Sequence, residues 1–204
     1  MLQILVMGGP VMVPLLICSV IALAVSLERI WYFLRTRVDS EDLMEEVKLA
    51  LQQGKILEAV QIAKRTPGQV ASLLAAGIAY HDRSREEVKE RLEEVGREEL
   101  YNMERRLVIL ESITAIAPLL GLLGTVTGII RTFQVLGGSR GLSSPAEISL
   151  GIAEALLTTA AGLIIAIPTL AVHHWIVNTI ERRVADMNRR AGELLDLLES
   201  EGRF

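Results

Sequence analysis

The chain has 204 residues, half of them hydrophobic, and its mean hydropathy is positive. The apolar residues are concentrated in long blocks with charged stretches between them, which excludes an ordinary soluble domain and indicates a helical protein with several membrane spans. The formal net charge of −4 argues against a nucleic-acid partner, and the single cysteine, Cys18, excludes a disulfide framework or a cysteine-based metal site.

The first predicted span lies within residues 4–27, and residues 1–27 contain no Lys or Arg. A secretory signal is excluded because the apolar run is too long and lacks a basic start and a small-residue cleavage site. Glu28, Arg29 and the aromatic residues at 31–33 then mark a membrane interface. We therefore expect residues 1–27 to form an outside N-terminus and transmembrane helix 1.

Residues 28–106 are predicted to form a cytoplasmic helical domain. Capping residues, glycines and a Thr-Pro-Gly break divide its first half into three short helices. These run from a cap at Asp39 or Ser40 to Gly54, then to the break at 66–68, and then over 68–81. Ser84 and Glu87 match a capping box that opens a charged helix. Because nothing decisive breaks that helix, it is predicted to continue into the second span, with Gly96 as its weak point.

Two further spans follow, each long enough to cross a hydrocarbon core of about 30 Å. Transmembrane helix 2 is predicted over 107–130 and transmembrane helix 3 over 148–175, with a periplasmic loop at 131–147. Ser144, Pro145 and Glu147 match the start of a helix. The tail at 176–204 continues the third span as an amphipathic helix.

Basic residues set the predicted orientation. Few Lys or Arg residues lie in the first 27 residues or in the outer loop, whereas they cluster around the middle segment and in the tail. The positive-inside rule therefore places the N-terminus outside the membrane and the C-terminus in the cytoplasm.

Glu154 stands out because it lies within the third apolar span, where a carboxylate costs about 3 kcal/mol. One interpretation is an interfacial or partner-paired acid; the other is a carboxylate that exchanges protons or another cation along a hydrated path. Thr158 lies one turn along the same helix face, with Thr159 beside it. We also expect Thr125 of the second span to lie at a depth similar to that of Glu154.

The remaining polar and small residues of the spans have alternative roles. Threonines in membrane helices often bond to their own backbone rather than line a pore. Small residues allow close helix packing, and prolines can kink their helices. The packing candidates are Gly121, Gly124, Gly128, Gly151 and Gly162, and the kink candidates are Pro118 and Pro168. Three helices with one deep acid cannot enclose a path alone, so an oligomer or a further membrane helix is required.

Two stretches, APLLGLLGTVTGII at 117–130 and GIAEALLTTAAGLIIAIP at 151–168, closely resemble the paired signatures of the MotA/TolQ/ExbB proton-channel family. The three-span layout resembles its ExbB and TolQ branch, since MotA-type members have an extra span. Within that branch the chain is taken as most like ExbB, with TolQ as the alternative. The resemblance implies a homopentamer whose central pore holds the helices of an ExbD- or TolR-like partner.

The same resemblance implies that Glu154, Thr125 and Thr159 line an ion path with the partner's essential Asp. Thr158 is often Ala in relatives, so either Thr158 or Thr159 could face the pore. The implied function is conversion of proton-motive force into motion at the bacterial inner membrane. A TonB-like protein would carry this work to outer-membrane transporters, or a TolA-like protein would serve envelope integrity.

Several alternatives stay open. The coupling ion is expected to be H+, although Na+ fits the same side chains, and no cofactor is expected. A membrane scaffold that conducts no ions would instead pair Glu154 statically with a basic group. An enzyme lacks support because the sequence has no nucleophile–base constellation, metal motif or phosphate-binding loop.

Overall fold

The structure is a computed structural model that describes residues 8–138 and 145–202, and every regular element in these ranges is an α-helix. The all-α prediction is confirmed. Three helical stretches are long and apolar enough to cross a membrane, as predicted. The chain divides into two units, which are described separately: the chain up to Glu28 with Arg106–Trp175, and Arg29–Arg105 with Ile176 onward.

The first unit contains the apolar parts of α2 (Met12–Arg35), α7 (Leu107–Gly138) and α8 (Pro145–Ser200). Helix α2 begins later than the predicted apolar run because Gly9 has a left-handed backbone, with φ of 67°, and Pro10 follows it. The prediction that the third span continues into the tail as one helix is confirmed. Its capping Ser144 lies outside the described residues.

Small and aliphatic side chains hold α2 against α7 and α8 within this unit. The buried cluster consists of Met12, Leu15, Ala22, Ile113, Ala117 and Ala166. Because lipid is as apolar as these side chains, their contribution in a membrane comes from close van der Waals contact rather than from removal from water.

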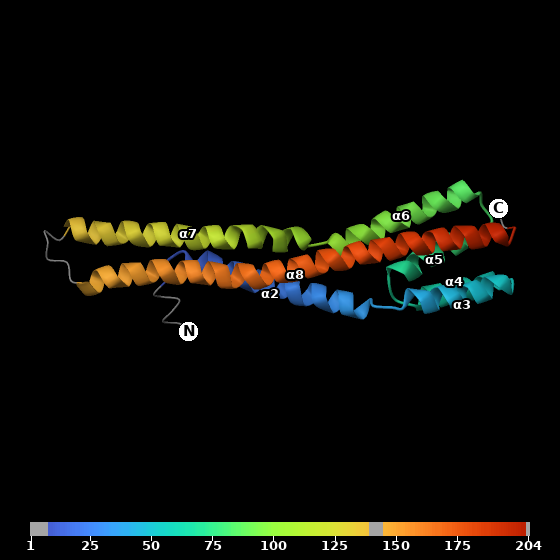
Figure 1. The fold of residues 1–204 in the computed structure, drawn as a ribbon, viewed down its shortest axis with the longest axis horizontal. Coiled ribbons are helices and arrows are strands. Elements are labelled where there is room, and N and C mark those ends of the chain that lie inside the picture. The colour runs from blue at the N-terminus through green and yellow to red at the C-terminus, as the bar shows by residue number, and fades with distance from the viewer. Residues whose placement is uncertain (1–7, 139–144, 203–204) are drawn as a thin grey trace. The chain divides into compact units, whose positions relative to one another are not determined.

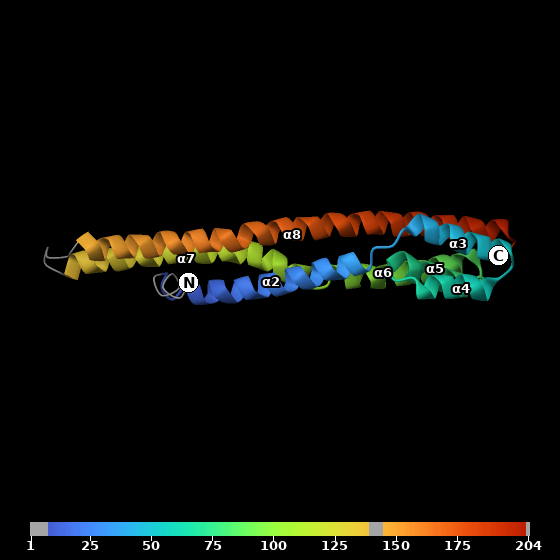
Figure 2. The same ribbon diagram turned by 90° about the horizontal axis from the view of Figure 1, so that it is seen from below.

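Helices α7 and α8 lie side by side and antiparallel in this unit (Figures 1 and 2). A Cβ atom built on Gly162 would lie 2.5 Å from the carbonyl oxygen of Ala117, and one on Gly121 would lie 3.1 Å from the Cα of Thr159. Glycine is therefore needed where the two backbones approach closely. The prolines Pro118 and Pro168 lie inside these helices, which continue past them.

The predicted long helix from Ser84 into the second span is wrong. Helix α6 (Arg85–Glu104) ends before Arg105, and α7 begins at Leu107. Arg106 has a left-handed backbone, with φ of 67°, and its side chain forms a 3.2 Å ion pair with Glu28. Gly96, the predicted weak point, lies within α6.

The second unit contains α3 (Ser40–Gln52), α4 (Ile56–Arg65), α5 (Gln69–Ala79), α6 and the rest of α8. The three predicted short helices are confirmed. Asp39 caps α3 by accepting a hydrogen bond from the backbone of Glu41, and Ser84 and Glu87 form the predicted capping box.

Arg183 of α8 ties three segments of this unit together. Its guanidinium donates hydrogen bonds of 2.6 Å to Thr36 Oγ1, 2.8 Å to Gln69 Oε1 and 2.7 Å to the carbonyl oxygen of Phe33. Burial lowers the pKa of Arg183, which reflects the lost hydration that these bonds replace.

We predict that Gly162→Ala lowers the free energy of unfolding by about 1–3 kcal/mol, because the added methyl group meets the α7 backbone. Thermal unfolding in detergent micelles measures this. Gly137→Ala is the matched control, since a Cβ there meets no other described atom within 4 Å, and it should be neutral or mildly stabilising. Equal effects of the two changes would contradict close packing at Gly162.

We also predict that Arg183→Met lowers the free energy of unfolding by about 2 kcal/mol, because Gln69, which is buried, loses its donor. Chemical denaturation followed by circular dichroism tests this. Arg182→Met, at the exposed neighbouring position, should change stability by less than about 0.5 kcal/mol. A similar loss in both variants would mean that charge alone, and not the three hydrogen bonds, matters.

Candidate functional site

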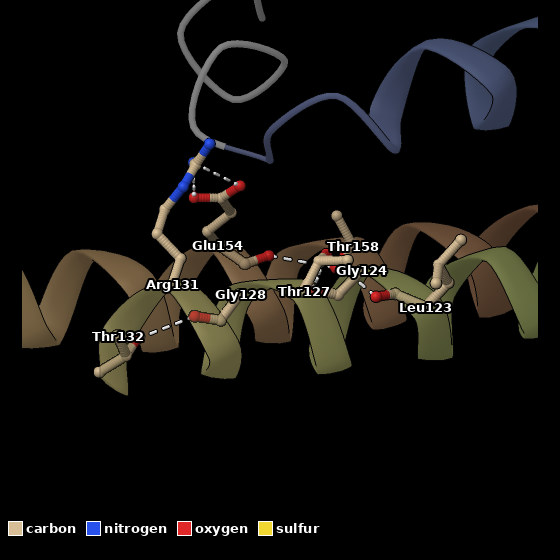
Figure 3. A network of polar contacts seen from close by, with 8 residues as sticks. All are labelled: Leu123, Gly124, Thr127, Gly128, Arg131, Thr132, Glu154 and Thr158. Carbon is tan, nitrogen blue, oxygen red and sulfur yellow. Dashed lines mark hydrogen bonds and ion pairs between the residues drawn. The ribbon is translucent and has the colours of Figure 1, made fainter. Parts of the chain in front are cut away.

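The Glu154 carboxylate forms an ion pair with Arg131 across the α7–α8 contact (Figure 3). The Arg131 Nη1 group donates to both carboxylate oxygens, at 3.2 Å to Oε1 and 3.0 Å to Oε2. The Glu154 side chain is only 16% exposed, whereas that of Arg131 is 61% exposed. The acid is thus held within the unit, and its counter-ion lies at the surface.

The chain just before α2 approaches this carboxylate closely. A Cβ atom on Gly9 would collide with Oε1 of Glu154, so only glycine fits here without a shift. The positive φ of Gly9 gives a second reason for glycine at this position. Figure 3 shows this segment, in blue, beside the ion pair. Glu154 is therefore covered from two sides, by Arg131 and by the backbone at Gly9.

A second polar contact joins α7 and α8 further along the spans. The hydroxyl groups of Thr125 and Thr159 lie 2.5 Å apart, and they lie 3.2 and 3.1 Å from the carbonyl oxygen of Gly121. Because each hydroxyl has only one proton to donate, two of these three contacts at most are hydrogen bonds at any one time. The cluster therefore places hydroxyl oxygens between the two helices without a fixed charge.

Thr158 occupies a different environment from that of Thr159. Its side chain is 1% exposed, and a Cβ atom on Gly124 would collide with it. Its hydroxyl donates back to α8, at 2.9 Å to the Ala155 carbonyl. It also lies 3.2 Å from the Glu154 carbonyl, the contact drawn in Figure 3. Within one protomer, Thr158 fills the notch that Gly124 leaves and satisfies its own helix.

The expected common depth of Thr125 and Glu154 is wrong. Arg131, not Thr125, faces the acid, and Thr125 pairs with Thr159, a little more than one turn further along α8. The second span was predicted to end at residue 130, but α7 continues to Gly138. Along α8, Thr125 therefore lies beside Thr159 and not beside Glu154.

Two side chains of this contact were missed by the sequence analysis as site residues. Arg131 was treated only as the basic end of a span, and Thr132 was not considered. Thr132 is 8% exposed, and its hydroxyl donates to the Gly128 carbonyl at 2.9 Å, close to Gly151. The signal for Arg131 was its sequence position, since an arginine near the end of an apolar run can pair with an acid on the next helix.

The site combines an ionisable pair with threonine hydroxyl groups and, in the part of the chain that the structure describes, lacks a cluster of the usual metal ligands. Among the described residues, no three His, Cys, Asp or Glu side chains lie close enough to hold a metal ion. One acid, one guanidinium and a pair of threonine hydroxyls in apolar spans are instead typical of ion-handling membrane proteins.

The fold and the site thus define a class: an all-helical membrane protein with three spans and an ionisable pair between the last two. Comparison with known proteins identifies one family. The profile of the MotA/TolQ/ExbB proton channel family matches residues 65–189. The chain therefore belongs to this family, in its ExbB/TolQ branch.

Three relatives illustrate the similarity. The chain is 36% identical over 197 residues to a putative biopolymer transport protein ExbB-like 1 of Synechocystis sp., covering 95% of this chain and 77% of that protein. It is 31% identical over 178 residues to a putative ExbB homolog of Methanothermobacter thermautotrophicus, covering 87% and 63%. A 98-residue match of 34% identity, covering 48% and 41%, joins it to the Tol-Pal system protein TolQ of Haemophilus influenzae.

We predict that Thr125→Val and Thr159→Val are energetically coupled, because each removes one side of the 2.5 Å hydroxyl contact. A double-mutant cycle by unfolding in micelles should give a coupling of about 0.6 kcal/mol, the usual size for such bonds in membrane helices. Thr127→Val, whose hydroxyl bonds only within α7 in the described contacts, should add to Thr159→Val without coupling. Additivity in the first pair would exclude the interhelical bond.

Proposed function

We propose that this chain is the ion-conducting subunit of a bacterial inner-membrane motor that uses proton-motive force to drive a partner protein, as an ExbB-type energiser of TonB-dependent outer-membrane transport. The role proposed is ion transfer coupled to force, without an enzymatic reaction or a cofactor. The observation that carries the proposal is the position of Glu154, a carboxylate only 16% exposed within the third apolar span.

Glu154 is suited to this role because it can change charge within an apolar span. Moving one charge through 100 mV releases about 2.3 kcal/mol, comparable to the cost of about 3 kcal/mol for placing a carboxylate there. Thr125 and Thr159 are the proposed continuation of the path, since their hydroxyl oxygens face each other across α7 and α8. Thr158 is the weaker candidate because its side chain is buried against Gly124.

Conduction requires further helices, because three spans cannot enclose a path. Large apolar side chains on α7 and α8 are exposed in the single chain, which supports covering by lipid and by other subunits. Examples are Leu119, Leu122, Val126, Ile152, Leu156 and Ile164. We propose a homopentamer around the helices of an ExbD- or TolR-like partner, whose carboxylate shares the path, with a TonB- or TolA-like protein receiving the work.

The proposed orientation places the N-terminus and residues 131–147 in the periplasm, and residues 28–106 and 176–204 in the cytoplasm. The basic residues that flank the apolar spans support this orientation. The proton is proposed as the coupling ion, and Na+ is the alternative that an experiment must separate.

Two other functions are considered. A TolQ-type role in envelope integrity uses the same chemistry, and the longer matches to ExbB-named relatives favour the ExbB-type role. A scaffold that conducts no ions is favoured by one observation, the Arg131–Glu154 ion pair, because a permanently paired acid would not carry protons.

The test is proton flux into proteoliposomes that hold the chain with its partner, under an imposed pH gradient and membrane potential, with and without Na+. We predict that Glu154→Gln reduces flux to the level of empty liposomes, because an amide cannot exchange a proton. Glu111→Gln is the matched control, an exposed acid on α7, and it should keep most of the flux.

Flux that survives Glu154→Gln would exclude Glu154 as the ion-handling acid. A complex that shows no flux and supports partner-dependent growth equally well with Glu or Gln at position 154 would favour the scaffold. Flux that depends on Na+ would replace the proton as coupling ion while leaving the motor role intact.

A further inference from the structure

We propose that Arg131 is a switchable counter-ion of Glu154: it holds the acid ionised when no second carboxylate is near, and releases it when a partner carboxylate takes over the guanidinium. The inference rests on the proposed function, since it assigns a control element to the same ion path. Arg131 is here a positioning residue, which acts through Glu154.

The geometry of the pair supports the holding state. A single nitrogen, Nη1, contacts both carboxylate oxygens at 3.2 and 3.0 Å, and the backbone at Gly9 covers Oε1. A guanidinium keeps its charge at any ordinary pH, so it favours the charged carboxylate. The intact pair therefore keeps the two opposite charges in contact.

The geometry also allows the guanidinium to be taken over. The pair uses only Nη1, so the three N–H groups of Nε and Nη2 take no part in it. The side chain is 61% exposed, whereas Glu154 is 16% exposed, so a group outside the protomer reaches Arg131 more readily than it reaches the acid. A planar donor of this kind suits a second carboxylate.

The protons and charges balance in the release step. A carboxylate on the partner's membrane helix accepts hydrogen bonds from Arg131, and the guanidinium moves away from Glu154. A proton from the periplasmic side adds to a carboxylate oxygen of Glu154, while Arg131 keeps all its hydrogens and its charge. The ionised partner carboxylate compensates that charge, so no unpaired charge is left in the span.

Few other described groups could form an ion pair or a hydrogen bond with the Glu154 carboxylate. Helix α7 contributes Arg131, and the described chain before α2, at 8–11, contributes Gly, Gly, Pro and Val, which do not titrate. Thr158 of α8 donates to the Glu154 backbone, not to its carboxylate. Arg131 is thus the charged side chain whose contact controls the acid in the described part of the chain.

The experiment measures the rate at which dicyclohexylcarbodiimide modifies Glu154 in the full-length purified protein, without partner, in lipid nanodiscs. This apolar reagent attacks protonated carboxyl groups, and mass spectrometry of the Glu154 peptide reports the product. We predict that Arg131→Gln accelerates labelling about tenfold or more, because the carboxyl group then loses the opposite charge that pairs with it. Arg131→Lys should restore a rate near that of the wild type.

Labelling of Glu111 gives the internal reference, and Glu154→Gln gives the background. Equal Glu154 labelling in wild type, Arg131→Gln and Arg131→Lys would overturn the proposal. Thermal unfolding is measured in parallel, and fast labelling in both Arg131 variants together with a lowered melting temperature would also overturn it, because it would indicate a merely structural role.

A second arm uses the co-purified complex. The wild-type chain should label faster with its partner than alone, and a partner whose membrane carboxylate is changed to the amide should abolish the increase. An unchanged rate in the complex would overturn the switching step. A labelling difference in the absence of any flux would keep the counter-ion role and reject the motor role, so the two failures are distinguishable.

Discussion

The glycines of α7 and α8 let the two backbones pack closely. This packing fixes which polar side chains of α7 and α8 lie opposite each other. Gly121, Gly124 and Gly128 on α7 each face a residue of α8 so closely that a Cβ atom would meet it. With no hydrophobic driving force between helices in lipid, such close packing is the main source of interhelical stability. The positions of Glu154 and Thr159 relative to α7 are therefore consequences of steric fit.

The ion pair at the end of this contact resolves a conflict between burial and charge. An isolated carboxylate in the span is costly, and an isolated guanidinium is equally so. Together they form a neutral pair, whose members differ in exposure. Because of this difference in exposure, the acid is shielded inside the protomer and the base lies at its surface. A static pair would make the acid inert, so the proposed ion transfer through Glu154 requires a group that competes for Arg131.

Much of this organisation is predictable from local chemistry. The spans follow from hydropathy, and α3 to α6 begin or end at capping residues and glycines that the sequence displays openly, such as Asp39 and Ser84. The break at Arg106 was missed because a left-handed arginine carries no local signal of the kind that glycine or proline gives. The pairing of Arg131 with Glu154 was missed because it depends on where α7 ends, and helix boundaries in apolar, Gly-containing sequence are weakly marked.

The interlocked glycines have a consequence for how such chains can evolve in length. One residue inserted into α8 between Gly151 and Gly162 would rotate the rest of the helix by about 100° and advance it by about 1.5 Å. Thr158 would leave the notch at Gly124, and either the acid or the threonines would lose their neighbours on α7. Only a compensating insertion at the matching level of α7 could restore both contacts. The segments 121–132 and 151–162 must therefore keep their lengths together for these contacts to form.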